Sequence, residues 1–183
     1  LQNADGKIIA GQLDIEASQI DNSRGLIGAS ESEAKVFARE RLDNGKGKIQ
    51  AKTTLAMSGG ELLNRGGTLA ADQMRVTAAR LDNSTKGVIS AENGAVELAL
   101  AQDLDNHDGK VQASTQLSVA AQSINNRNAS LTGKTIEMTS RGALDNTQGT
   151  ISSADTVITS ADMDNSQGLI QGNDRLKLTA QDL

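Results

Sequence analysis

The chain has 183 residues and a formal net charge of −5, with 18 basic and 23 acidic residues mixed along its length. It contains no cysteine, which excludes disulfide frameworks, thiol redox chemistry and thiolate metal sites. No basic run or aromatic series offers a docking strip for phosphates and bases, so we expect no nucleic acid partner. No apolar run approaches membrane-spanning length, and we expect neither membrane insertion nor a signal peptide.

A short phrase recurs along the chain at intervals of 19–23 residues. An aliphatic anchor is followed by Asp-Asn, two variable residues, Gly, one residue and another aliphatic, as in Leu144 to Ile151. The anchors are Leu1, Ile20, Leu42, Leu62, Leu81, Leu104, Ile124, Leu144, Met163 and Leu183. A fixed period near twenty predicts a solenoid of about nine stacked units. Because residue 1 falls inside a repeat, we expect residues 1–183 to be one array, taken from a longer protein without its native caps.

The third position of the phrase is asparagine in every unit. These residues are Asn3, Asn22, Asn44, Asn64, Asn83, Asn106, Asn126, Asn146 and Asn165. Asparagine tolerates a left-handed backbone and bonds its own neighbouring main chain, so the column predicts a corner. Stacking would let each side-chain amide donate to the asparagine of the next layer, which predicts a structural ladder instead of a catalytic role.

The preceding position is mostly aspartate, with Leu63 and Asn125 among the exceptions. We expect these carboxylates to accept main-chain amides of their own turn, although cation binding by the column stays open. The only histidine, His107, lies near Asp105 and Asp108. Catalysis or metal binding there would need further convergent ligands that the spacing does not supply, so we expect no cofactor.

Glycine follows five residues after most anchors, one residue late at Gly87, and is replaced by Ala129 in the seventh unit. This predicts either a positive backbone angle or a close approach between coils. Two residues further the position is always aliphatic, and two beyond that it is always small, which indicates a short strand with one face inward. A second alternating strand closes most units, as at Leu13 to Ala17 and Met74 to Ala78.

Two short strands per unit without a helix exclude leucine-rich, ankyrin and helical-pair solenoids. What remains is an all-β parallel β-helix, in which each strand pairs with its copies above and below. A spacing of about 4.8 Å per coil predicts a rod on the order of 40 Å long. Only Glu31 to Arg41 shows a weak helical period.

The phrase LDNxxGxI followed by alternating apolar residues resembles the repeats of filamentous haemagglutinins and of contact-dependent growth-inhibition exoproteins, from Leu1 to Leu183. The resemblance implies a right-handed β-helical stalk on the surface of a Gram-negative bacterium, secreted through an outer-membrane transporter by two-partner secretion. It implies a non-enzymatic stalk or adhesive segment that presents a distal adhesive or toxic domain.

Two alternatives follow from the resemblance and the fold. In the first alternative, the chain is the receptor-binding segment of a growth-inhibition protein. This segment contacts a protein or glycan on a host or neighbouring cell. A β-helical glycan-active enzyme is the second alternative, which the fold permits only by analogy. Unpaired strand edges at the ends of the array predict fraying or end-to-end self-association.

The two longest units contain extra residues that must leave the coil as loops. In the longer stretch around Phe37, an outward ring would lie beside Arg39 and Arg41 and form a partner contact. The wider coil slightly favours the alternative, in which Phe37 fills the core.

Overall fold

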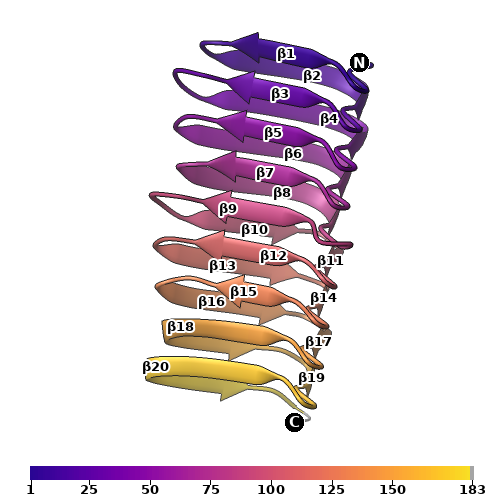
Figure 1. Ribbon diagram of the computed structural model, residues 1–183. Coiled ribbons are helices and arrows are strands. Elements are labelled where there is room, and N and C mark those ends of the chain that lie inside the picture. Colours follow the sequence, from indigo (N-terminus) through magenta and orange to yellow (C-terminus); the bar gives the residue numbers. More distant parts are fainter. Residues whose placement is uncertain (182–183) are drawn as a thin grey trace.

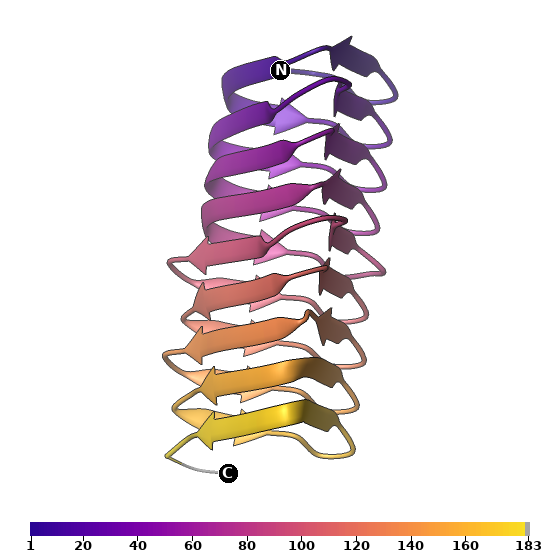
Figure 2. The same cartoon turned by 90° about the vertical axis from the view of Figure 1, so that its left-hand side faces the viewer.

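The computed structural model describes residues 1–181 as a rod of stacked coils (Figure 1). Twenty strands pair in parallel in one continuous sheet, and no helix occurs within the described residues. The strands in front run to the left and return to the right behind as the chain descends, so the coil is right-handed. Figure 2 shows the coils stacked along a single axis from the N-terminus to the C-terminus. The predicted right-handed parallel β-helix of about nine coils is therefore confirmed.

Each coil contributes to three rows of strands that run along the axis. The first row follows the glycine of each phrase and contains β1 (Lys7–Ala10), β3 (Leu26–Ala29), β5 (Lys48–Ala51), β7 (Thr68–Ala71), β9 (Val88–Ala91), β12 (Lys110–Ala113) and β15 (Ser130–Thr132). The second row contains β10 (Val96–Leu100), β13 (Gln116–Ala121) and β16 (Thr135–Ser140). The third row carries the anchors and contains β11 (Asp103–Asp105), β14 (Ser123–Asn125), β17 (Ala143–Asp145) and β19 (Asp162–Asp164).

Longer strands pass from one row to the next through a bend. Four continue from the second row into the third: β2 (Leu13–Asp21), β4 (Ala34–Asp43), β6 (Thr54–Leu63) and β8 (Gln73–Asp82). Two continue from the first row into the second: β18 (Thr150–Thr159) and β20 (Leu169–Thr179). The pairing register shifts at such bends, for example between Ala17 and Gln19 in β2.

Equivalent positions of successive phrases pair with one another. In the first row Ile27 pairs with Ile49, Ile49 with Leu69, and Leu69 with Ile89. The register is therefore set by the repeat, and distance along the chain becomes height along the axis.

The core is a column of aliphatic side chains stacked on like side chains. The buried anchors are Ile20, Leu42, Leu62, Leu81, Leu104, Ile124, Leu144 and Met163. The first row contributes fully buried residues at Ile27, Ile49, Leu69, Ile89, Val111, Leu131 and Ile151. Burial of each of these side chains stabilises the folded chain by roughly 1.5–3 kcal/mol relative to an exposed side chain. Only coils with neighbours on both sides gain this stabilisation fully. Leu176 and Leu178, in the last described coil, are accordingly 45% and 36% exposed.

Two expectations about the secondary structure are wrong, and one predicted anchor lies outside the described residues. Each coil has a third strand, such as Asp103–Asp105, that the two-strand interpretation overlooked because three residues are too short to show alternation. The stretch Glu31 to Arg41 is not helical, since β4 occupies most of it, with Ala34 and Val36 buried. The last predicted anchor, Leu183, lies beyond the described residues.

Candidate interaction surface

The asparagines of the phrase lie in one line at the corner between the third and first rows. Each Nδ2 donates to the Oδ1 of the next asparagine at 2.6–2.8 Å, from Asn3 through to Asn165. From Asn22 to Asn146 these residues are at most 1% exposed, and their remaining amide hydrogens reach nearby carbonyls, as from Asn22 to the Lys48 oxygen at 3.2 Å. Because a buried amide is costly unless every group is bonded, the line fixes the stacking register.

The glycine of the phrase is required by close approach between coils. A Cβ at Gly25 would lie 2.2 Å from the Asn3 carbonyl oxygen and 2.6 Å from Asn22 Oδ1. The positive φ falls one residue earlier, at Arg24 with φ 56°. Of the two predicted reasons for the column, close approach therefore applies. The variable residue before it takes the left-handed conformation, which its mixed residue types did not reveal.

Ala129 shows how the corner accommodates a methyl group. Its backbone N–H donates to the Asn126 carbonyl at 3.3 Å, against 2.9 Å for the equivalent bond of Gly149 to Asn146. The Asn106 amide reaches the Ser130 oxygen at 3.5 Å, whereas Asn22 reaches Lys48 at 3.2 Å. The seventh unit therefore keeps the corner by lengthening its bonds.

The aspartates before the asparagines cap their own turns, as the turn chemistry predicts. The Oδ1 atom accepts the backbone N–H two residues on in these pairs: Asp21 from Ser23, Asp43 from Gly45, Asp82 from Ser84, Asp105 from His107, Asp145 from Thr147 and Asp164 from Ser166. Asn125 accepts from Arg127 at 3.2 Å in the same way. Asparagine therefore replaces aspartate here without loss of the turn bond.

Asp82 is the most enclosed aspartate of this column, at 5% exposure. Arg65 Nε donates to its Oδ2 at 2.5 Å from the preceding coil. Burial raises the pKa of Asp82, but hydrogen bonds from Ser84 and Arg65 together outweigh it and hold the pKa below its usual value. Leu63, one of the exceptions in this column, is buried one coil above.

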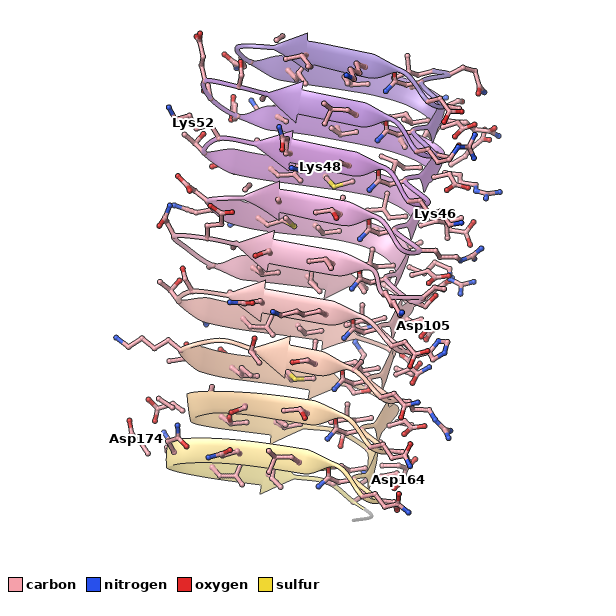
Figure 3. All side chains as sticks on the ribbon, in the orientation of Figure 1. Lys46, Lys48, Lys52, Asp105, Asp164 and Asp174 are labelled. Atoms are coloured by element: carbon pink, nitrogen blue, oxygen red, sulfur yellow. The ribbon has the colours of Figure 1, made fainter. Side chains whose placement is uncertain are left out.

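More exposed carboxylates of this corner are also held in their charged form. Hydrogen bonds from Ser23 keep the pKa of Asp21 below its usual value, and those from Ser166 do the same for Asp164. Figure 3 shows Asp105 and Asp164 on this corner of the rod, where Lys46 also lies. The corner therefore presents charges of both signs to solvent.

His107 lies on the same corner with an exposed side chain. Its Nε2 lies 3.2 Å from Asp108 Oδ2, and both side chains are nearly half exposed. Within the described residues, no group of three or more His, Cys, Asp or Glu side chains has an arrangement that would hold a metal ion.

Phe37 lies on the outer face of the second row, so the expectation that it fills the core is wrong. Strand alternation sends Ala34, Val36 and Ala38 inward, where they are at most 2% exposed, and the ring outward. The ring borders a shallow hollow of about 360 Å³.

This Phe37 hollow exists because the next coil has small outward residues. Phe37 pairs with Ser58, and Lys35 pairs with Ala56. The small side chains of the third coil therefore leave the outer surface depressed between coils two and four. Arg75 pairs with Ala56 from the other side and closes the hollow. An aromatic ring, hydroxyl groups, two cationic side chains and the carboxylate of Asp14 therefore line one depression.

The predicted neighbours of Phe37 do not gather beside it. Arg41 lies beyond the bend of β4, in the third row. Its guanidinium forms an ion pair with Asp43 at 2.9 Å and approaches the Glu61 carboxylate at 3.9 Å. Arg39 is exposed at the bend, where the register shifts. Lys35 and Arg75 are the cations beside the ring, and only the pairing of coils reveals Arg75, which is 38 residues away in sequence.

A second hollow of about 540 Å³ lies where the first row ends, near the loops on the left of Figure 3. Its charged residues are Lys48, Lys52, Asp72 and Glu92, and Asn93 lies among them. The charges balance, so this loop hollow is formally neutral. The Phe37 hollow and the loop hollow both lie within coils one to five.

Continuous parallel rows closed by an asparagine ladder define the protein as a β-solenoid. Its sequence matches the haemagglutinin repeat over residues 1–106, 91–148 and 145–183, and the chain belongs to this family. Membership implies a filamentous, adhesin-like stalk segment, and proteins of the family are generally secreted surface filaments. Comparisons with curated proteins and with solved structures gave no match. The described residues include no helix that is long and apolar enough to cross a membrane.

Proposed function

We propose that the chain is a non-enzymatic spacer and adhesive segment of a surface filament secreted by a Gram-negative bacterium. The observation that carries the proposal is the uninterrupted pairing of all three rows along the axis, which makes the chain stiff in the direction in which it must reach. In this role the rod holds a distal adhesive or toxic domain away from the cell.

The adhesive part of the proposal rests on the Phe37 hollow. Exposed aromatic rings beside arginine are typical of contact spots, and sugars pack their apolar faces against aromatic rings. Lys35 and Arg75 would then orient polar groups of a glycan or of a surface protein. Host cells and neighbouring bacterial cells both present such ligands.

Adhesion of beads coated with the protein tests this function. We expect beads to bind intact cells, and Phe37→Ala to reduce binding while the thermal melting temperature stays within about 2 °C, because the ring is outside the core. Thr139→Ala, on the outer face of a distant coil, is the matched control. Binding confined to bacterial cells would favour the alternative function, the receptor-binding segment of a growth-inhibition protein. Unchanged binding by Phe37→Ala would show that the Phe37 hollow is not the contact site.

Small-angle scattering tests the spacer. Two copies of the chain joined in register should double the length of the rod and leave its cross-section unchanged. A compact particle of larger cross-section would contradict the proposal.

A further inference from the structure

The sequence contains two Asn-Gly dipeptides, Asn44-Gly45 and Asn93-Gly94. In such a pair the glycine backbone nitrogen attacks the side-chain carbonyl carbon, and ammonia leaves as a five-membered imide ring closes. Water then opens the ring and yields aspartate or isoaspartate. Glycine favours the attack because it has no side chain to obstruct it and its backbone is permissive. The reaction needs an accessible carboxamide and a glycine N–H that is not already bonded.

The first dipeptide is locked by the ladder. Asn44 is 0% exposed, its Nδ2 donates to Asn64 at 2.7 Å, and its Oδ1 accepts from Asn22 at 2.7 Å. The Gly45 N–H donates to Asp43 Oδ1 at 2.9 Å. Ring closure at Asn44 would break all three bonds inside a buried network, so it requires local unfolding of the coil.

The side chain of the second dipeptide lacks this protection, although Gly94 is buried. Asn93 is exposed in the loop between β9 and β10, where the fifth coil has extra residues. Its backbone N–H reaches the Asp72 oxygen only at 3.4 Å, and its Nδ2 donates to Asp72 Oδ1 at 2.6 Å. Among the described residues, no acceptor is found for the Gly94 N–H and no donor for Asn93 Oδ1. One exposed hydrogen bond therefore holds the reacting carboxamide.

The glycine has a structural reason to remain at this place. A Cβ at Gly94 would lie 2.5 Å from Gln73 Cγ and 3.0 Å from the Asp72 carbonyl oxygen. The loop therefore needs a residue without a side chain, and that residue is the one that makes its neighbour reactive.

We propose that Asn93 is a site of spontaneous deamidation in the folded protein and that Asn44 is not. The product places a carboxylate against Asp72, where the amide now donates, so an attractive contact becomes a repulsive one. The loop hollow changes from formally neutral to a charge of −1, because Lys48 and Lys52 no longer balance three carboxylates. The modification therefore turns this hollow into a weak acceptor for cationic groups and leaves the ladder intact.

Peptide mass spectrometry of the aged protein tests the proposal. The purified chain is incubated in mildly alkaline buffer, folded or in concentrated urea, and the conversion of each asparagine is followed over time. In the folded protein we expect Asn93 to react at least about tenfold faster than Asn44, because only Asn44 needs the coil to open. In urea the two rates should become similar, since both dipeptides then have the same chemistry.

The variant Asn93→Gln provides the control, because a longer side chain closes a less favourable ring. The aged wild type should acquire an additional acidic species in ion-exchange chromatography, and the aged variant should lack it. Equal rates at Asn44 and Asn93 in the folded protein would overturn the proposal. So would an unmodified Asn93 in folded protein when the urea sample has reacted there.

Discussion

Single residues at the corner show that charge and hydrogen bonding in this rod are set by the neighbouring coil. Asp82 is held by Ser84 of its own turn and by Arg65 of the preceding one. Its lowered pKa means that its contribution to stability is present above the unfolded pKa of 3.8 and is lost as the pH falls through the folded value.

We therefore expect Asp82→Asn to lower the free energy of unfolding at neutral pH. An asparagine keeps the turn bond, as Asn125 shows, but loses the attraction to Arg65. The deficit should begin to shrink as the pH falls below 3.8 and should be lost below the lower folded pKa, where the folded wild-type carboxylate is itself protonated. Urea titrations at neutral and acidic pH measure this, with the exposed Asp162→Asn as control. A deficit that does not depend on pH would show that the charge is not involved.

Two serines provide a second prediction at this scale. Ser140 Oγ donates to the carbonyl of Ala143 at 2.8 Å, whereas Ser160 Oγ is buried and has no hydrogen-bond partner among the described residues. An unsatisfied buried hydroxyl costs about 1–3 kcal/mol, so Ser160→Ala should stabilise the chain by about 1 kcal/mol. Ser140→Ala should destabilise it by a similar amount. Thermal melts of both variants decide the matter, and loss of stability in both would contradict the assignment of Ser160.

At the scale of strands, the repeated phrase predicts what faces inward in the first row. Ile151, two residues beyond Gly149, is 0% exposed, and Asp145 lies at a half-exposed turn. Ile151→Asp should cost more than about 4 kcal/mol, because it buries a carboxylate without a partner. Asp145→Asn should cost less than about 1 kcal/mol, since the turn bond persists. Circular dichroism melts compare the two, and equal losses would contradict the inward placement of Ile151.

The sequence predicts these elements best at positions whose side chain has the same structural role in every coil. The asparagine and aliphatic columns each have one physical cause, which nine copies identify. The glycine column left two causes open, and only the close approach between coils in the structure decides between them. The third strand was overlooked because Asp103–Asp105 is too short to alternate, and its outer residues vary. The left-handed residue before the glycine was overlooked because Arg24 and Gln148 share no chemistry.

Contacts between coils were predictable only where the register was known. Phe37 and Arg75 line the same hollow from either side of an intervening coil whose outward residues are small, and no residue close to either in the sequence indicates this. The inward prediction for Phe37 failed because the extra length of its coil leaves the stack instead of widening the core. Extra residues form the loop before Ala34 and the bend near Arg39, so strand alternation still decides the direction of the ring.

For the whole molecule, the repeat that lets coils stack also leaves apolar surface on the last described coil. Leu176 and Leu178 are 45% and 36% exposed there, although Thr156 and Ile158, their pairing partners one coil earlier, are fully buried. The strand edge of β20 beside them has backbone groups oriented to continue the parallel pairing. A second copy of the chain offers a matching coil at its other end.

We therefore expect end-to-end association that grows with protein concentration. Light scattering should give a mass that rises from one chain towards two or more, and scattering profiles should show longer particles of unchanged width. Leu176→Lys should shift the association to at least about tenfold higher concentration, because it places a charge on the joining surface. Thr159→Lys, on the outer face one coil earlier, is the control and should associate as the wild type does. A mass of one chain at every concentration would contradict this prediction, and side-by-side particles of doubled width would place the contact on the outer faces instead.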